Sequence, residues 1–256
     1  MIVTTSQNEH PLAIERAKMI ASELNLGFIP RNDRSLDTMY QKYGESILVV
    51  NRREIKWYRQ NSNQPFFFHP GLSVVRIKRL ISGDNDIMIQ TCQLQSGDHF
   101  LDCTLGLAAD AIVASYAVGE AGRVVGLESE PMLAYLVRLG LKDVQSILPI
   151  EQATRRIEVL SGHHDQWLQE FPDKSFDVVY FDPMFREGIK ESSSLKTLRD
   201  YANPSPISLE AVRQAERIAR KRVVLKEHKN SDEWERLGFS PMRRENMDVT
   251  YGVIEV

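Results

Sequence analysis

Four segments of this 256-residue chain place polar residues directly after runs of apolar residues. They are HFLDCTLG (99–106), RVVGLE (123–128), RIEVLSGHHD (156–165) and FDVVYFDP (176–183). Each apolar run is typical of a buried strand in a parallel sheet. Such sheets bind ligands beyond the carboxyl ends of their strands, where the strand order reverses. We therefore expect Asp102, Glu128 and Asp182 to lie together at one site.

The turn after the first segment indicates which ligand this site takes. A dinucleotide needs the pattern G-x-G-x-x-G so that the backbone can approach the pyrophosphate, but DCTLGLAAD (102–110) has only Gly106. Glu128 lies 22 residues after Gly106, the spacing at which a carboxylate reaches ribose hydroxyls. Asp102 could receive an ammonium group. A ribose, an amine and a carboxylate without phosphates together describe S-adenosylmethionine (SAM).

The string Asp182-Pro183-Met184-Phe185 could orient an amino group. The exocyclic amine of a nucleobase is a poor nucleophile because its lone pair is delocalised into the ring. The carboxylate of Asp182 and the carbonyl of Pro183 could accept its two hydrogens and turn the lone pair toward a sulfonium methyl. Phe185 offers a face on which the base could stack. No deprotonation precedes the transfer, so catalysis would depend on positioning.

From residue 98 onward, apolar segments alternate with amphipathic ones. This pattern predicts an α/β fold with a doubly wound, Rossmann-like sheet covered on both faces. We expect five parallel strands, namely the four segments above and RVVLKEH (222–228), and a final hairpin over 244–256. Helices are expected over 107–118, 130–147, 165–171 and 208–220. Residues 186–206 form a long polar connection, which we interpret as a lid over the acceptor.

Residues 1–83 are typical of a smaller α+β domain, and residues 84–256 of the SAM-binding domain, with the boundary at the turn GDND (83–86). In the first part we expect a helix capped by Ser35 and three strands, ILVVN, EIKWYRQ and PFFFH. Residues 52–79 carry seven Lys and Arg against one Glu, interleaved with aromatic residues. That composition is typical of a surface that contacts RNA. The alternative is a buried aromatic strand flanked by solvated arginines.

With these segments, the chain resembles the class I SAM-dependent methyltransferases. Within them it is similar to the family of the bacterial small-subunit ribosomal RNA guanine-N2 methyltransferase (RsmJ type). The strings that carry the likeness are DCTLGLAAD, GLESEP, VVYFDPMF and RVVLKEH. The N-terminal block, with FFFHP and RIKRLISG, is similar to a Gram-positive branch of the same superfamily. The resemblance implies guanine in ribosomal RNA as acceptor, and cofactor contacts from Asp102, Thr104, Gly106, Asp110, Glu128, Ser129, His163 and Asp165.

Two positions differ from the pattern of these relatives. The turn SGHHD has a histidine where many relatives have an acid after the glycine, so Asp165 or His163 could contact the adenine. Phe185 replaces a tyrosine common in related loops, which preserves stacking and removes a hydroxyl. No third ligand follows the histidine pair at a recognisable spacing, so we expect no metal site.

The composition is that of an ordinary globular chain, with 42% hydrophobic and 26% charged residues. The apolar stretch Ile47–Val50 is far shorter than the roughly 20 residues that span a bilayer, and the N-terminus lacks the pattern of a signal peptide. We expect Cys92 and Cys103 to be buried thiols. Together these features predict a cytoplasmic protein without a membrane partner.

Three other functions compete with an RNA base methyltransferase. The first is methylation of a protein carboxylate or a small-molecule amine, although the DPMF string favours an amino nitrogen over an oxygen. The second is a non-catalytic RNA-binding or assembly factor on the same scaffold, against which the intact set of strand-end residues speaks. The third is an NAD-dependent reductase, which lacks the required glycine pattern.

Overall fold

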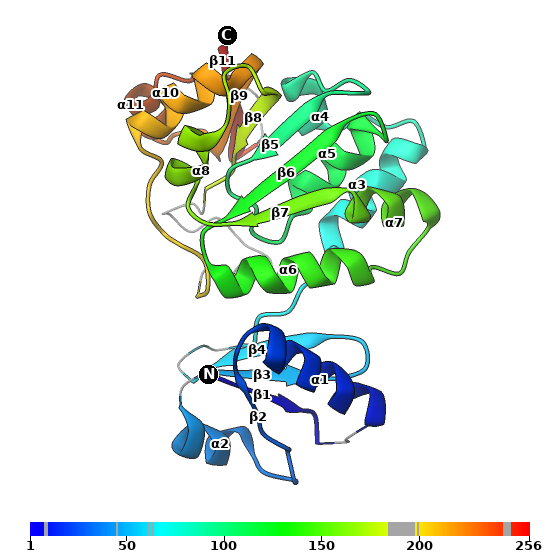
Figure 1. Cartoon of the computed structure of the whole chain (residues 1–256). Coiled ribbons are helices and arrows are strands. Elements are labelled where there is room, and N and C mark those ends of the chain that lie inside the picture. Colours follow the sequence, from blue (N-terminus) through cyan, green and yellow to red (C-terminus); the bar gives the residue numbers. More distant parts are fainter. Residues whose placement is uncertain are drawn as a thin grey trace. The chain divides into compact units, whose positions relative to one another are not determined.

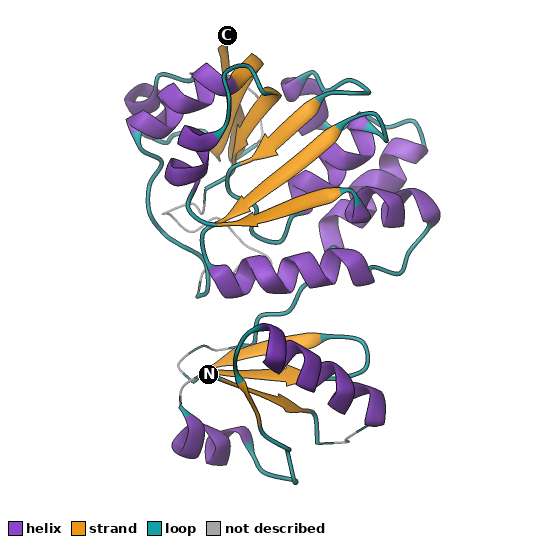
Figure 2. Ribbon diagram, viewed as in Figure 1, coloured by secondary structure: helices purple, strands orange, loops and turns teal. Residues whose placement is uncertain are grey.

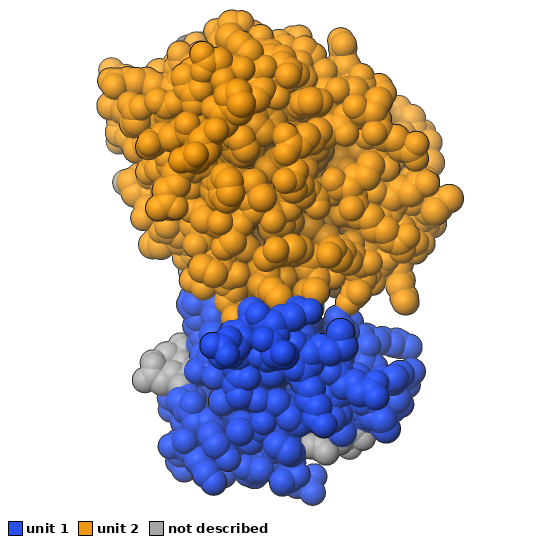
Figure 3. Space-filling model, in the orientation of Figure 1, with its two compact units in different colours: residues 1–68, 192–201 blue, residues 69–191, 202–256 orange. Residues whose placement is uncertain are grey.

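The computed structural model describes residues 1–7, 10–44, 46–60, 62, 64–183, 198, 200–242 and 247–256. The chain divides into two compact units, coloured separately in Figure 3. The first comprises residues 1–68 and 192–201, and the second residues 69–191 and 202–256. The division precedes the turn at 83–86 because helix α3 (Gly71–Ile81) packs against α5 (Ala109–Val118) of the second unit. The roles of the two parts stay predictions.

The first unit contains a four-stranded sheet with the order β2-β1-β3-β4, packed with helices that include α1 and α2 (Figure 2). Its elements are β1 (Ile2–Thr5), α1 (Pro11–Glu23), β2 (Gly27–Phe28), α2 (Leu36–Tyr43), β3 (Ser46–Val50) and β4 (Ile55–Arg59). The hydroxyl of Ser35 caps α2 as expected, accepting from the N–H of Thr38. The strand expected over PFFFH is absent from the described residues, where only Phe66 pairs, in an isolated bridge with Trp57. Pro65 has no N–H with which to extend that pairing.

The second unit is built on a seven-stranded sheet with the order β10-β11-β9-β8-β5-β6-β7. The strands are β5 (His99–Asp102), β6 (Arg123–Glu128), β7 (Ile157–Ser161), β8 (Phe176–Phe181), β9 (Ala219–His228), β10 (Ser240–Pro241) and β11 (Val249–Glu255). Five neighbouring strands of this sheet, β9, β8, β5, β6 and β7, are parallel to one another, and β11 is antiparallel to β9. The order reverses between β5 and β8. This confirms the predicted Rossmann-like sheet.

Helices cover both faces of this sheet (Figure 1). With α3 and α5, they are α4 (Ile87–Cys92), α6 (Pro131–Asp143), α7 (Leu148–Arg155), α8 (His164–Glu170), α10 (Leu209–Ile218) and α11 (Glu233–Leu237). One core joins α8, α10 and α11 to strand residues such as Leu101, Val179 and Val223. Along β8 all six residues are buried, as an internal parallel strand requires.

Several local boundaries differ from the sequence patterns. The helix expected over 130–147 ends at Asp143, and the separate helix α7 follows it. The helix expected to reach residue 220 ends at Ile218, and β9 begins at Ala219, so the pairing of β9 with β8 overrides the helical pattern there. The C-terminal hairpin, expected over 244–256, begins earlier, because it pairs β10 with β11. In the described part of the chain, every helix is too short or too polar to cross a bilayer. The cytoplasmic location stays a prediction.

Candidate active site

A pocket lies at the carboxyl ends of the parallel strands of the second unit, where the strand order reverses. The turn after β5, the ends of β6 and β8, the start of α8 and the chain leading into α10 contribute to it. Its lining residues are Cys103, Thr104, Gly106, Leu127, Glu128, Ser129, His163, His164, Asp182, Pro183, Ala202, Asn203, Ser205 and Ile207.

The turn after β5 connects the first two carboxylates to the backbone. Gly106 has a φ of 49°, a left-handed conformation that glycine adopts readily. Its N–H donates to Oε2 of Glu128 over 3.1 Å, and the N–H of Glu130 donates to Oε1 over 2.9 Å. Oδ1 of Asp102 accepts from the N–H of Thr104 at 3.0 Å. Backbone amides therefore orient both carboxylates.

Asp102 and Glu128 are buried acids without an ion-pair partner among the described residues, although the charge of Lys226 acts on Asp102 from a greater distance. Asp102 is 2% exposed and Glu128 6%, and neither forms an ion pair within the described residues. Burial raises the pKa of Asp102 to about 8, with the negative charge of Asp110 adding to the effect. Burial also raises the pKa of Glu128, although its backbone hydrogen bonds oppose the rise. Such carboxylates gain most from a ligand that brings positive charge or hydroxyl groups.

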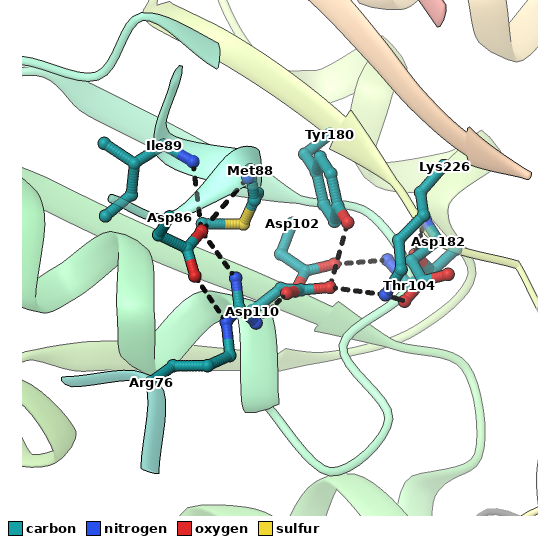
Figure 4. A network of polar contacts seen from close by, with 10 residues as sticks. All are labelled: Arg76, Asp86, Met88, Ile89, Asp102, Thr104, Asp110, Tyr180, Asp182 and Lys226. Atoms are coloured by element: carbon teal, nitrogen blue, oxygen red, sulfur yellow. Dashed lines mark hydrogen bonds and ion pairs between the residues drawn. The ribbon is translucent and has the colours of Figure 1, made fainter. Parts of the chain in front are cut away.

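Asp182, directly after β8, has a different environment (Figure 4). Its N–H donates to Oγ1 of Thr104 over 2.6 Å, and its Oδ2 accepts from Nζ of Lys226 at 2.7 Å. Lys226, on β9, also donates to Oδ2 of Asp110 over 3.1 Å. The side chain of Asp182 is 26% exposed and lines the pocket. Burial raises the pKa of Asp182 to about 6, and the charge of Lys226 limits that rise.

Asp110, in the first turn of α5, is held by three side chains. Tyr180 donates to its Oδ2 over 2.9 Å, alongside Lys226, and Arg76 pairs with its Oδ1. Arg76, from α3, also donates to both oxygens of Asp86 over 2.7 and 2.9 Å. Burial opposes ionisation of Asp110, but Lys226 and Arg76 hold its pKa well below the ordinary value. The ion-pair chain, as we call it, is Asp86, Arg76, Asp110, Lys226 and Asp182.

Two histidines at the start of α8 line the pocket. Nδ1 of His163 accepts from the N–H of Asp165 at 3.3 Å and so caps α8. His164 is 7% exposed, and its Nε2 has no hydrogen-bond partner among the described residues. Burial, with the charge of His163, lowers the pKa of His164 to about 4, so its ring is neutral at pH 7. Its Nε2 is enclosed by the protein and lies 3.7 Å from Oδ1 of Asp165.

The family model described as "Putative SAM-dependent methyltransferase" matches residues 35–237. The chain belongs to this family of SAM-dependent methyltransferases. Its cofactor is therefore SAM, as the single-glycine turn predicts. The pocket fits that cofactor, because buried carboxylates without an ion-pair partner among the described residues suit its ammonium, sulfonium and ribose groups.

Two related proteins align with most of this chain. An uncharacterised Bacillus subtilis protein, YpiP, is 40% identical over 255 residues, which is 99% of each chain. Ribosomal RNA small subunit methyltransferase J of Hahella chejuensis is 26% identical over 228 residues, covering 85% of this chain and 82% of that protein. This similarity confirms the resemblance to the RsmJ type.

A solved structure shows the same fold. The SAM-dependent methyltransferase NGO1261 from Neisseria gonorrhoeae superposes with a TM-score of 0.62, covering 100% of this chain and 96% of that chain. The two sequences are 15% identical, so the match concerns the fold alone. It extends over both units of the methyltransferase.

The structure brings most of the residues predicted from sequence to the pocket. Those that line it are Thr104, Gly106, Glu128, Ser129, His163, Asp182 and Pro183. Asp102 and Asp110 lie behind them, joined through backbone and side-chain hydrogen bonds. Asp165 is less favoured as an adenine contact than His163, because its Oδ1 accepts from Ser208 at 3.0 Å. Phe185 and residues 186–197 lie outside the described residues.

Sequence reasoning about the methyltransferase missed two residues, Lys226 and His164. The signal for Lys226 was a lysine within the buried run of β9, and the signal for His164 was a second histidine in the turn before α8. One ligand atom each of His163, His164 and Asp165 lie within 4.8 Å of one another. These three atoms are close enough together to bind one metal ion, so the expected absence of a metal stays a prediction.

Proposed function

We propose that the methyltransferase transfers the methyl group of SAM to the exocyclic amino nitrogen of a guanine in ribosomal RNA. The observation that carries the proposal is the position of Asp182 and Pro183, a partly exposed carboxylate and a proline carbonyl at the pocket, directly after β8. The similarity to a ribosomal RNA small subunit methyltransferase over 82% of its length supports RNA as the acceptor.

In this proposal the cofactor lies against the ends of β5, β6 and β7. Glu128 accepts hydrogen bonds from the ribose hydroxyls, and Asp102 neutralises the ammonium group. Gly106 lines the pocket in a left-handed conformation that favours glycine, so the backbone can pass beneath the ligand there. His163 and His164 contact the adenine. The neutral ring of His164 and the place of both histidines in the pocket lining support that role.

The acceptor amine lies between the cofactor and Asp182. When bound, SAM supplies a methyl carbon made electrophilic by its sulfonium. The carboxylate of Asp182 and the carbonyl of Pro183 accept the two amine hydrogens, so the lone pair turns toward that carbon. A nitrogen–carbon bond forms as the carbon–sulfur bond breaks, and its electron pair stays on sulfur. One proton then leaves the nitrogen, and the carboxylate of Asp182 can accept it.

The first unit is proposed to contact the RNA, through fewer basic residues than the composition of segment 52–79 indicates. Arg76 belongs to the ion-pair chain of the second unit. The guanidinium of Arg59 lies 4.2 Å from the ring centroid of Trp57 and donates to a backbone carbonyl. Arg52 and Arg53 are exposed in the turn between β3 and β4. Phosphate contacts of the first unit are therefore assigned to this turn.

Transfer of tritium from labelled SAM to total RNA tests the proposal. The RNA comes from a strain that lacks the gene, so that the target position is unmethylated. Nuclease digestion is expected to give label in N2-methylguanosine from small-subunit ribosomal RNA. The surface variant Glu158→Ala serves as a matched positive control, because Glu158 is 48% exposed on β7, pairs with Arg123 at the start of β6 and does not line the pocket. Label in protein or small molecules alone would overturn RNA as the acceptor.

A further inference from the structure

We propose that Lys226 is a positioning residue for methyl transfer, whose ammonium group keeps Asp182 ionised and turned toward the acceptor. The proposal rests on the proposed function in one respect, namely that Asp182 meets an amine. Lys226 touches neither the acceptor nor the cofactor in this account. It acts through Asp182 alone.

The surroundings of Lys226 explain why a lysine is present in this strand. The three residues before it, Val223, Val224 and Leu225, are fully buried, as expected for an internal strand. The side chain of Lys226 itself is only 23% exposed. A lysine so placed requires anionic partners. It has two, since Nζ lies 2.7 Å from Oδ2 of Asp182 and 3.1 Å from Oδ2 of Asp110.

These two partners differ in how firmly they are held. Asp110 is in a helix and is also bonded to Tyr180 and Arg76, so it supplies a fixed anchor for the ammonium group. Asp182 lies beyond the end of β8 and is held through its N–H and through Oδ2. Because Lys226 contacts both residues, it holds the carboxylate of Asp182 in a fixed position relative to Asp110. The amine would bond to Oδ1.

The charge of Lys226 also decides the protonation of Asp182. The charged and titratable groups around the pair are Arg76 from α3, Asp102 from β5, Asp110 from α5, Tyr180 from β8 and Tyr251 from β11. Burial and Asp110 favour the protonated form of Asp182, and Lys226 opposes both. A protonated Asp182 would present a donor where the amine needs an acceptor.

The first test is a titration of the Asp182 carboxyl carbon by NMR in the full-length protein. The wild-type midpoint is expected near 6. In Lys226→Met it is expected to rise by about 1–3 pH units, the usual effect of removing an adjacent opposite charge. Lys226→Gln, which keeps a hydrogen-bond donor without charge, should behave in the same way. An unchanged midpoint in either variant would overturn the proposal.

A matched control lies on the same strand. Lys221 pairs with Asp98 at 2.5 Å and Asp177 at 3.5 Å at the opposite end of β9, so Lys221→Met removes a similar ion pair away from the pocket. It is expected to leave the Asp182 midpoint in place. If neither Lys226 variant folds, the wild type decides, because a midpoint above about 8 would contradict pairing with an ammonium group.

The second test is the pH dependence of single-turnover transfer from tritiated SAM to total RNA from the strain that lacks the gene. For a midpoint raised by about two units, Lys226→Met should lose about tenfold in rate at pH 7 and recover as pH approaches 9. Lys226→Arg should retain most of the rate. An equal loss at every pH would assign Lys226 a merely structural role. The titration needs no acceptor, so it remains decisive if RNA is not the substrate.

Discussion

The carboxylates of the pocket form two groups that differ in what neutralises them. Asp102 and Glu128 accept only neutral hydrogen bonds within the described residues, and both have raised pKa values. Asp110 and Asp182 share the ammonium group of Lys226. Asp102 and Glu128 have no ion-pair partner among the described residues, whereas Asp110 and Asp182 are paired with cationic side chains of the protein. The contrast supports the proposed roles, in which the first group binds the cationic cofactor and Asp182 of the second group orients the acceptor amine.

Asp182 provides the largest test of this contrast. Asp182→Ala is expected to lower the single-turnover rate by about 10²–10³, as removal of other preorganised polar groups does. Asp182→Asn should keep measurable turnover, because an amide oxygen can still accept a hydrogen bond from the amine. Both variants should bind SAM as the wild type does, measured by calorimetry. Equal inactivity of the two variants would make Asp182 an obligate base rather than an acceptor of hydrogen bonds.

Glu128 tests the other group. Hydrogen bonds to a charged group are worth roughly 1.5–3 kcal/mol, so Glu128→Ala should weaken SAM binding by about ten- to a hundredfold. The maximal single-turnover rate at saturating cofactor should fall far less. Glu158→Ala on the neighbouring strand is the matched control and should bind SAM normally. Unchanged affinity in Glu128→Ala would remove this carboxylate from the cofactor site.

The two groups also differ in how far sequence predicts them. The sequence predicts Asp102 and Glu128 as site residues because each stands at the end of an apolar run that forms a strand. Strand β6 has the predicted bounds. The pairing of Lys226 requires knowing that β9 lies beside β8, which local patterns do not specify. Arg76 was counted as surface charge because its partner Asp110 is 34 residues away. Asp182 and Asp110 are themselves among the residues predicted from sequence, but the ion pairs that hold them depend on long-range contacts that local sequence patterns do not show.

Asp102 predicts that cofactor binding is linked to protons. Its pKa of about 8 lies far above the ordinary value near 4. Between these values the folded protein holds a proton that the unfolded chain has lost, so this residue contributes less stability as pH rises from about 4 to about 8. The ammonium group of SAM favours the carboxylate, so binding at pH 7 should release close to one proton. Affinity should rise by about fivefold between pH 7 and pH 8.

Calorimetry in two buffers with different ionisation enthalpies measures this proton release. Asp102→Asn should bind SAM more weakly, without the proton release and without the rise in affinity with pH. Glu158→Ala, on the exposed side of β7, is the control and should keep both. Proton release that persists in Asp102→Asn would place the linked group elsewhere.

Thr104 provides the smallest and most discriminating test, because it touches both groups. Its N–H donates to Asp102, and its hydroxyl accepts from the N–H of Asp182. Thr104→Val keeps the first bond and removes the second. A neutral hydrogen bond is worth about 1 kcal/mol, so the single-turnover rate should fall by about threefold to tenfold, and Thr104→Ser should restore it. SAM affinity should change less than twofold. An equal loss of affinity and rate would show that the two groups act as one unit.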